Sequence, residues 1–197
     1  MVFHVRDYDL AATLDSGQVF RWQKQNDSWI GVVGKYCAQL TQTPDGIRAE
    51  TATPVKDWHW LRDFLQTEVV WAAILETFPD DAPMRAAVAA CHGLRVLRQD
   101  PWECLASFIL SSTKQIVQIR QIISLLCERF GEPVAPGAPA SLPAASVFCA
   151  KTRRQAAGAP GNVRCGVESA ARLDSAIGRT LQFSFPTPAR IAEQIAA

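Results

Sequence analysis

The stretch "LRQDPWECLASFILSSTKQIVQIRQIISLLCERFG" (97–131) carries the strongest structural signals in the chain. Asp100 is a good N-cap, Pro101 suits the first helical position, and Glu103 completes a capping box. Because all three signals fall at the start of an apolar run, they predict a helix over 101–111.

A second helix is predicted immediately after the first. Ser112 followed by Gln115 repeats the capping-box pattern, and Gly131 suits the end of the helix. Apolar residues at helical spacing predict its buried stripe: Ile116, Ile119, Ile122, Ile123, Leu126 and Phe130. The polar junction "SSTKQ" (111–115) has two interpretations. It is either a plain helix–helix connection or a helix start whose free N–H groups and positive dipole end bind phosphate.

Upstream of these helices the sequence is typical of an antiparallel sheet. Short runs rich in β-branched and aromatic residues alternate with the turn sequences "QND" and "PDG". The predicted strands are 18–22, 28–34, 36–42 and 46–53. Gln18, Phe20 and Trp22 are expected on one strand face, with Phe20 and Trp22 in the core.

Between the sheet and the capped helix, the segments "VKDWHWLRDFL", "VVWAAILETF" and "APMRAAVAAC" repeat apolar residues at helical spacing. Gly93 is a plausible stop for the last of them. Strands followed by helices predict an α+β fold.

The composition changes after Gly131. Residues 132–182 are dominated by Ala, Arg, Pro and Gly and show no sustained period, so we expect a disordered, low-complexity segment. GC-rich codons specify the same four residue types, so the segment resembles GC-rich DNA translated in the wrong frame. Residues 183–197 are expected to form an isolated helical fragment, with Thr187 as cap and Pro188 at its first position.

Bulk properties indicate a soluble globular protein. The 197 residues are 48% hydrophobic and 20% charged, and no apolar run is long enough for a membrane span. Six cysteines are scattered without a CxxC pair, which predicts reduced thiols. The three histidines are isolated, so no metal site is expected, and His92 is interpreted as a surface or cap residue. Without a signal peptide, a cytoplasmic location is expected.

Charge is unevenly distributed along the chain. Residues 1–84 hold 7 Lys and Arg against 12 Asp and Glu, a net charge of −5. Residues 85–130 and 131–197 each carry +3. This moderate basic excess permits DNA binding but does not by itself predict it.

Two separated motifs give the chain a family resemblance. "SGQVFRW" (16–22) is similar to the pattern "SGQxFRW", and the stretch from residue 97 is similar to "LRQDPxECLxSFIxSSxxNIxRI". Both patterns belong to the 8-oxoguanine DNA glycosylase family. The resemblance covers roughly residues 10–131.

The resemblance implies a domain plan. Residues 1–95 correspond to the N-terminal antiparallel β-sheet domain, and 96–131 to the first helices of an all-α helix-hairpin-helix glycosylase domain that is incomplete here. The implied partner is double-stranded DNA containing 8-oxoguanine, bound by a monomer without cofactor or metal. A bacterial protein of this kind would be cytoplasmic and associated with the nucleoid.

The resemblance assigns a lesion contact to Gly17. The damaged base is flipped out of the duplex, and a backbone carbonyl faces its position 7, where 8-oxoguanine has an N–H and guanine a lone pair. Glycine suits such a close backbone approach. The structural alternative is a turn glycine that precedes a strand.

By the same resemblance, Thr113, Lys114 and Gln115 enter the gap left by the flipped base. The family has an asparagine-rich stretch there, whereas positions 113–115 of this chain contain no asparagine. Threonine lacks the paired amide donor and acceptor that would face the unpaired cytosine. Lys114 can reach a phosphate, and Gln115 offers an amide.

The family's catalytic residues have no counterpart in this sequence. The nucleophilic lysine belongs to a "PGVGxKxA" hairpin, and none of the five lysines, at positions 24, 35, 56, 114 and 151, lies in one. No candidate for the catalytic aspartate is found either, so no catalytic residue is assigned. The chain therefore resembles a truncated or frame-disrupted 8-oxoguanine DNA glycosylase and apurinic/apyrimidinic lyase. The alternative is a non-catalytic DNA-binding remnant or an inactive fragment.

Overall fold

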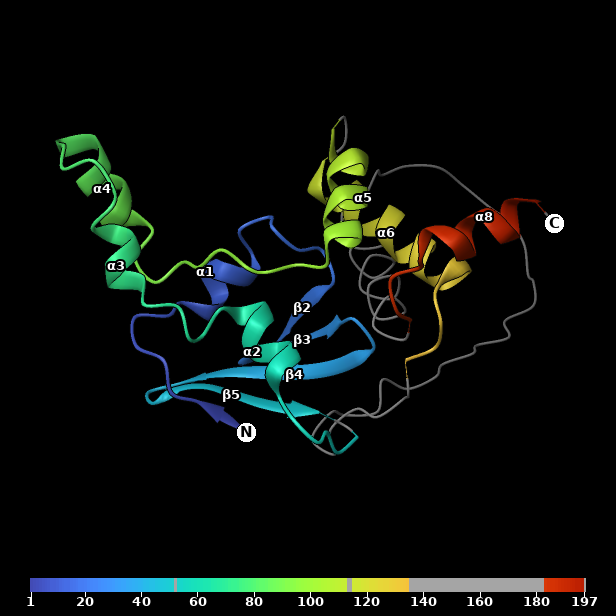
Figure 1. Cartoon of the computed structure of the whole chain (residues 1–197), viewed down its shortest axis with the longest axis horizontal. Coiled ribbons are helices and arrows are strands. Elements are labelled where there is room, and N and C mark those ends of the chain that lie inside the picture. Colours follow the sequence, from blue (N-terminus) through green and yellow to red (C-terminus); the bar gives the residue numbers. More distant parts are fainter. Residues whose placement is uncertain (52, 113–114, 135–182, 197) are drawn as a thin grey trace, which may run out of the picture.

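The computed structural model describes residues 1–51, 53–112, 115–134 and 183–196. A five-stranded antiparallel sheet forms one half of the molecule, and Figure 1 shows helices above it and at both ends. The strands are β1 (Val2–Phe3), β2 (Trp22–Gln25), β3 (Ser28–Val33), β4 (Tyr36–Thr43) and β5 (Gly46–Thr51).

The sheet is a meander of β2 to β5, with β1 added at the edge beside β5. The spatial order is β1-β5-β4-β3-β2, so β2 to β5 follow one another and β1 pairs with β5. Two of its hairpins use the predicted turns: Asn26 and Asp27 connect β2 to β3, and Pro44 and Asp45 connect β4 to β5.

One face of the sheet carries the main core. Trp29, Leu40 and Ala49 form a cross-strand row that is buried on β3, β4 and β5. Trp22 lies over Gly31, where a Cβ atom would come within 2.2 Å of the indole ring. A side chain at position 31 is therefore excluded by the tryptophan that fills its space.

Two short helices cover this face: α1 (Leu10–Leu14) and α2 (His59–Leu65). Leu61 and Leu65 of α2 are fully buried, and Phe64 stacks on Trp22 with ring centroids 5.8 Å apart. The sheet and these two helices thus share one core.

Helices at the two ends complete the described chain. Figure 1 shows α3 (Trp71–Leu75) and α4 (Ala82–Ala90) projecting at one end, and α5 (Pro101–Ser111), α6 (Ile116–Phe130) and α8 (Pro188–Ala196) at the other. Ile119, Ile123 and Cys127 of α6 form a second, smaller core with Phe20 and with Phe183 beside α8. None of the helices among the described residues is both long and apolar enough to span a membrane.

Several predictions are confirmed. Asp100 caps α5 through hydrogen bonds from the N–H groups of Trp102 and Glu103, and Pro101 begins the helix. Gly131 ends α6. Thr187 accepts from the N–H of Arg190 at 3.3 Å, in the predicted cap position before Pro188. The α+β architecture also stands.

The predicted strand over 18–22 is wrong. Residues 15–21 form a loop, and β2 begins only at Trp22. The Gln18 side chain is hydrogen bonded to the segment around residue 95, and Phe20 leaves the sheet to pack against α6. Of the two expected core residues, Trp22 is buried in the main core while Phe20 is half-buried in the second.

The start of the second helix also differs from the prediction. Gln115, not Ser112, is the N-cap of α6, and Ser112 instead ends α5. Ile116 shares the helix face of Ile119 and Ile123, but it lies in the first turn of α6, before the second core begins, and is 51% exposed. The buried residues of α6 are Ile119, Ile123, Ser124 and Cys127.

The segment after residue 182 is helical as predicted, but it is not isolated. Ser184 donates its N–H to the carbonyl of Glu132 at 2.8 Å, and the Trp102 indole donates to the carbonyl of Pro186 at 2.9 Å. These contacts hold the segment against α5 and the end of α6. The predicted disorder of 132–182 lies outside the described residues from position 135 onward.

Candidate nucleic-acid interface

Gly17 occupies the loop between α1 and β2. Its φ angle is +85°, a backbone conformation that favours glycine. A Cβ atom built at this position would meet none of the described atoms within 4 Å, so open space lies beside the backbone. The loop therefore presents an accessible main chain to an approaching molecule.

Gln18 fixes one side of this loop. Its Nε2 donates to the carbonyl of Arg95 at 2.9 Å, and its Oε1 accepts from the N–H of Leu97 at 2.9 Å. The same Nε2 donates to Ser16 Oγ at 2.9 Å. One side chain thus joins the Gly17 loop to the extended segment that leads into α5.

The other side of the loop contacts α6. The Asp15 carboxylate accepts from Arg120 Nη2 at 3.1 Å, and Phe20 packs against the second core around Ile119. The loop is therefore bounded by Gln18 toward the sheet domain and by Asp15 and Phe20 toward the helical part.

The α5–α6 connection is described only in part. Thr113 and Lys114 lie outside the described residues, so their predicted contact with DNA stays a prediction. Gln115 is exposed at the first turn of α6, where its N–H donates to Gln118 Oε1 at 3.2 Å. Arg120 follows Gln115 by five residues, about 7.5 Å along a helix axis. Gly17 and Gln115 therefore belong to two elements that contact each other through Arg120.

A buried ion pair holds the base of the interface. Arg21, whose side chain is 2% exposed, lies with Nη1 3.5 Å from Glu103 Oε2 of α5 and also donates to the carbonyl of Phe183. Burial raises the pKa of the Glu103 carboxyl, the Arg21 charge opposes that rise, and Asp100 adds to it. Arg21 thus connects the loop, α5 and the segment before α8.

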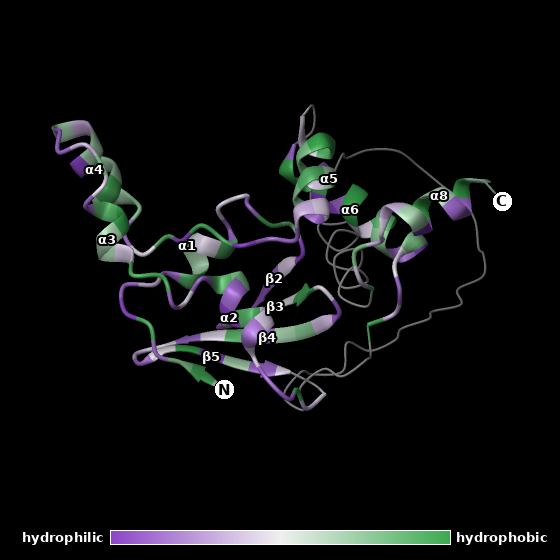
Figure 2. Cartoon of the chain, in the orientation of Figure 1, coloured by the Kyte–Doolittle hydropathy of each residue, from purple (hydrophilic) through white to green (hydrophobic). Residues whose placement is uncertain are grey.

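The surface of α5 is unusually apolar. Leu105, Phe108 and Ile109 are 52%, 71% and 59% exposed, and Val117 of α6 is 48% exposed. Figure 2 shows this hydrophobic character along α5. An apolar face of this kind, on the described part of the helical region, is suited to contact with another apolar surface.

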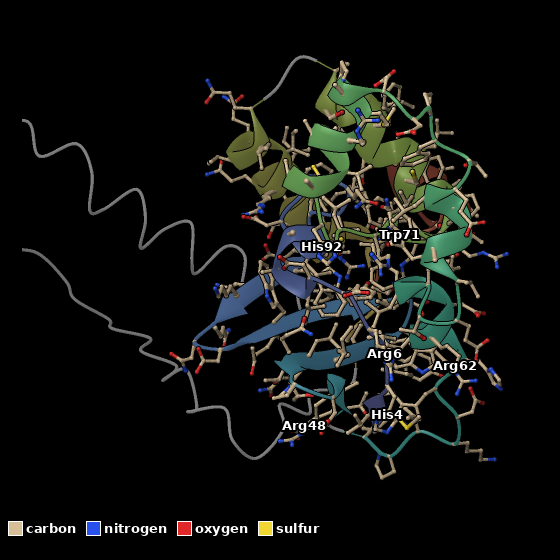
Figure 3. The ribbon with its side chains drawn as sticks, turned by 90° about the vertical axis from the view of Figure 1, so that its left-hand side faces the viewer. His4, Arg6, Arg48, Arg62, Trp71 and His92 are labelled. Atoms are coloured by element: carbon tan, nitrogen blue, oxygen red, sulfur yellow. The ribbon has the colours of Figure 1, made fainter. Side chains whose placement is uncertain are left out.

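Two clefts lie on another side of the molecule. His4, Arg6 and His92 line a cleft of ≈ 660 Å³, and Trp71 helps to line an apolar cleft of ≈ 780 Å³ beside α3 and α4 (Figure 3). Neither includes Gly17 or Gln115. His92 is 69% exposed, as expected for a surface residue. No set of three or more potential metal ligands occurs within the described ranges.

Sequence reasoning did not identify Asp15, Gln18 or Arg120 as parts of this site. Gln18 lay within a motif that was noted, but its position was interpreted as a strand. The Asp15–Arg120 pair joins residues 105 positions apart, and neither residue has a local signal that points to the other.

Comparison with known proteins shows which family the sequence matches. A family model described as "8-oxoguanine DNA glycosylase, N-terminal domain" matches residues 1–105. The N-glycosylase/DNA lyase OGG1 of Arabidopsis thaliana is 32% identical over 124 residues, covering 59% of this chain and 34% of the relative. The N-glycosylase/DNA lyase of Saccharomyces cerevisiae is 26% identical over 142 residues, covering 62% and 36%. The chain thus spans about a third of the length of these curated relatives.

Solved structures share the fold. MBOgg1 in complex with a low-affinity DNA ligand is 32% identical, with a TM-score of 0.61 that covers 66% of this chain and 45% of that one. The apo form of the Clostridium acetobutylicum 8-oxoguanine glycosylase/lyase, at 24% identity, also has a TM-score of 0.61, covering 66% and 46%. The N-terminal sheet with its helices is common to these structures.

Proposed function

We propose, because the chain belongs to the 8-oxoguanine DNA glycosylase family, that it forms the lesion-contacting part of a DNA N-glycosylase/DNA lyase of base-excision repair. Its substrate in this proposal is double-stranded DNA containing 8-oxoguanine. The open backbone at Gly17 is the observation that carries this proposal.

The chemistry of the lesion fits that backbone. 8-Oxoguanine carries an N–H at position 7, so a facing carbonyl accepts a hydrogen bond from it, whereas the lone pair of guanine repels the same carbonyl. A mispaired buried polar group costs about 1–3 kcal/mol. Nothing described lies within 4 Å of where a side chain at position 17 would begin, and in this proposal the Gly17 carbonyl makes this contact once the base leaves the stack.

The start of α6 is the second part of the proposed surface. Thr113, Lys114 and Gln115 would occupy the gap left by the flipped base, with Lys114 close to phosphate. Because phosphate contacts are electrostatic and release counterions, DNA binding should weaken steeply as salt increases. Besides the charge of Lys114, the partial positive charge at the N-terminus of α6 would attract phosphate to this surface.

Base excision needs a further group, an amine nucleophile placed against the sugar. Lys24, Lys35 and Lys56 belong to the sheet and its connections, and no described lysine lies in α5 or α6. We therefore expect these 197 residues to bind DNA without excising the base on their own. Non-catalytic DNA binding is thus the second candidate function for the chain as it stands.

One experiment tests both parts of this proposal. The chain is mixed with a fluorescent duplex carrying 8-oxoguanine opposite cytosine, in parallel with an undamaged duplex, at several salt concentrations and with borohydride trapping. Salt-sensitive binding without a trapped adduct is expected. A strong adduct that disappears in Lys114→Gln would overturn the catalytic part, and absence of binding at low salt would overturn the whole proposal.

We also propose that the protein acts as a monomer in the cytoplasm, associated with the nucleoid if its source is bacterial. DNA is the partner that motivates this location. Sedimentation at micromolar concentration tests the monomer, and a dimer held through the apolar face of α5 would contradict it.

A further inference from the structure

We propose that Asp15 and Arg120 are positioning residues: their ion pair sets the Gly17 loop against the first turns of α6. The inference rests on the proposed function, since both elements are assigned to the DNA-facing surface. In this proposal the two side chains act by positioning the loop, without contacting DNA themselves.

The geometry places this pair between the two proposed contacts. Asp15 stands two residues before Gly17, and Arg120 five residues after Gln115, with Oδ1 and Nη2 3.1 Å apart. The backbone of Asp15 is itself fixed, because its N–H donates to the carbonyl of Ala11 at the end of α1 at 3.0 Å. The carboxylate therefore reaches α6 from a held position.

The Arg120 side chain is more buried than that of a typical surface arginine. It is 26% exposed, and its Nε is buried without a hydrogen-bond partner among the described residues. Ile119 and Ile123, one residue before and three residues after Arg120 on α6, contribute to the second core. Loss of Asp15 would leave the guanidinium without the ion pair that orients it.

The rest of the loop shows why this contact decides its position. Gln18 attaches Gly17 to the segment around residue 95, which belongs to the sheet domain's side. Asp15 attaches the loop to α6 through an ion pair, and Phe20 attaches it through apolar packing. Apolar packing is non-directional, so the Asp15–Arg120 ion pair adds a directional constraint between the loop and α6.

For the variant Asp15→Asn, a purely electrostatic effect and a positioning role predict opposite changes in DNA affinity. Asp15 places a negative charge near a surface that would meet phosphates, so Asp15→Asn should strengthen DNA binding if electrostatics were its only effect. If the pair positions the loop, Asp15→Asn weakens binding despite losing that charge. The sign of the change therefore separates positioning from simple electrostatics.

The test compares Asp15→Asn, Arg120→Gln and the double variant in binding to a duplex with 8-oxoguanine opposite an abasic analogue. An unpaired base lowers the cost of extrusion. Asp15 is 66% exposed, so the effect is modest: about threefold weaker binding for Asp15→Asn, with the double variant no weaker than Arg120→Gln. Asp80→Asn and Arg85→Gln, the exposed pair on and before α4, are matched controls. Stronger binding in Asp15→Asn, with additive effects, would overturn the proposal.

A measurement without DNA keeps the two proposals separate. The amide order parameter of Gly17, measured by NMR relaxation on the full chain, should fall in Asp15→Asn and Arg120→Gln and stay unchanged in the α4 controls. If the wild type fails to bind DNA but the order parameter falls, the proposed function is wrong while the positioning role stands. An unchanged order parameter contradicts positioning.

Discussion

Replacing Gly17 with alanine separates backbone strain from a role in recognition. A φ of +85° is unfavourable for a residue with a Cβ atom, at a cost of roughly 1–2 kcal/mol, and no described atom would clash with the added methyl group. Gly17→Ala should therefore lower the free energy of unfolding by about 1 kcal/mol, entirely through its backbone.

Gly34 provides a matched control for this substitution. It also has a positive φ, +57°, and open space where a Cβ would lie, but it is in the β3–β4 turn, outside the proposed interface. Gly34→Ala should destabilise the chain to a similar extent. Urea unfolding followed by tryptophan fluorescence measures both changes.

The two variants should differ in their recognition of DNA. Using the duplex with an unpaired 8-oxoguanine, the wild type should prefer the lesion over unpaired guanine by at least about fivefold, the low end of a 1–3 kcal/mol contact. Gly17→Ala should abolish that preference, because its methyl group occupies the space needed by the base. Equal preferences in Gly17→Ala, Gly34→Ala and the wild type would refute the assignment of Gly17.

Three further predictions concern the fold. Gly31→Ala should destabilise the chain by about 1–3 kcal/mol in urea unfolding, because its Cβ would come within 2.2 Å of the Trp22 ring; a change under about 0.5 kcal/mol would contradict this packing. The pKa of Glu103 is raised in the fold by burial, so the stability that this residue contributes is present below its unfolded pKa and lost as the pH rises through the folded value. As the pH rises above the unfolded pKa of Glu103, the stability difference between the neutral variant Glu103→Gln and the wild type should therefore shift in favour of the variant, and a shift in favour of the wild type would reverse the sign assigned here. Burial raises the pKa of Cys127 to about 11, so at pH 8 a thiol reagent should label exposed Cys91 but not Cys127, as peptide mapping would show; equal labelling would place Cys127 at the surface.

Local signals predicted the parts of the fold that local chemistry determines. Asp100 and Pro101 specify the start of α5, and the turns around Asn26 and Asp45 specify two hairpins. Alternation alone could not tell a strand from a loop at 18–22, because the hydrogen bonds of Gln18 reach residues almost 80 positions away.

The candidate site divides in the same way. Gly17 was assigned to the site because it lies in a motif that resembles a known family, and that assignment stays a prediction; the structure adds its positive φ and open surroundings. Asp15 and Arg120 were not identifiable, since their meeting depends on how the sheet domain and α6 pack. Likewise, the cap of α6 moved from Ser112 to Gln115 because helix α5 extends to Ser111.

The central claim is that the Gly17 loop and the start of α6 form one DNA-facing surface. It is tested most directly by NMR titration of the isotope-labelled chain with the duplex carrying 8-oxoguanine. The account predicts that amide shifts change first at residues 15–20 and 115–120, and that salt reverses the changes. Changes confined to the cleft of His4, Arg6 and His92, or no change at low salt, would contradict it.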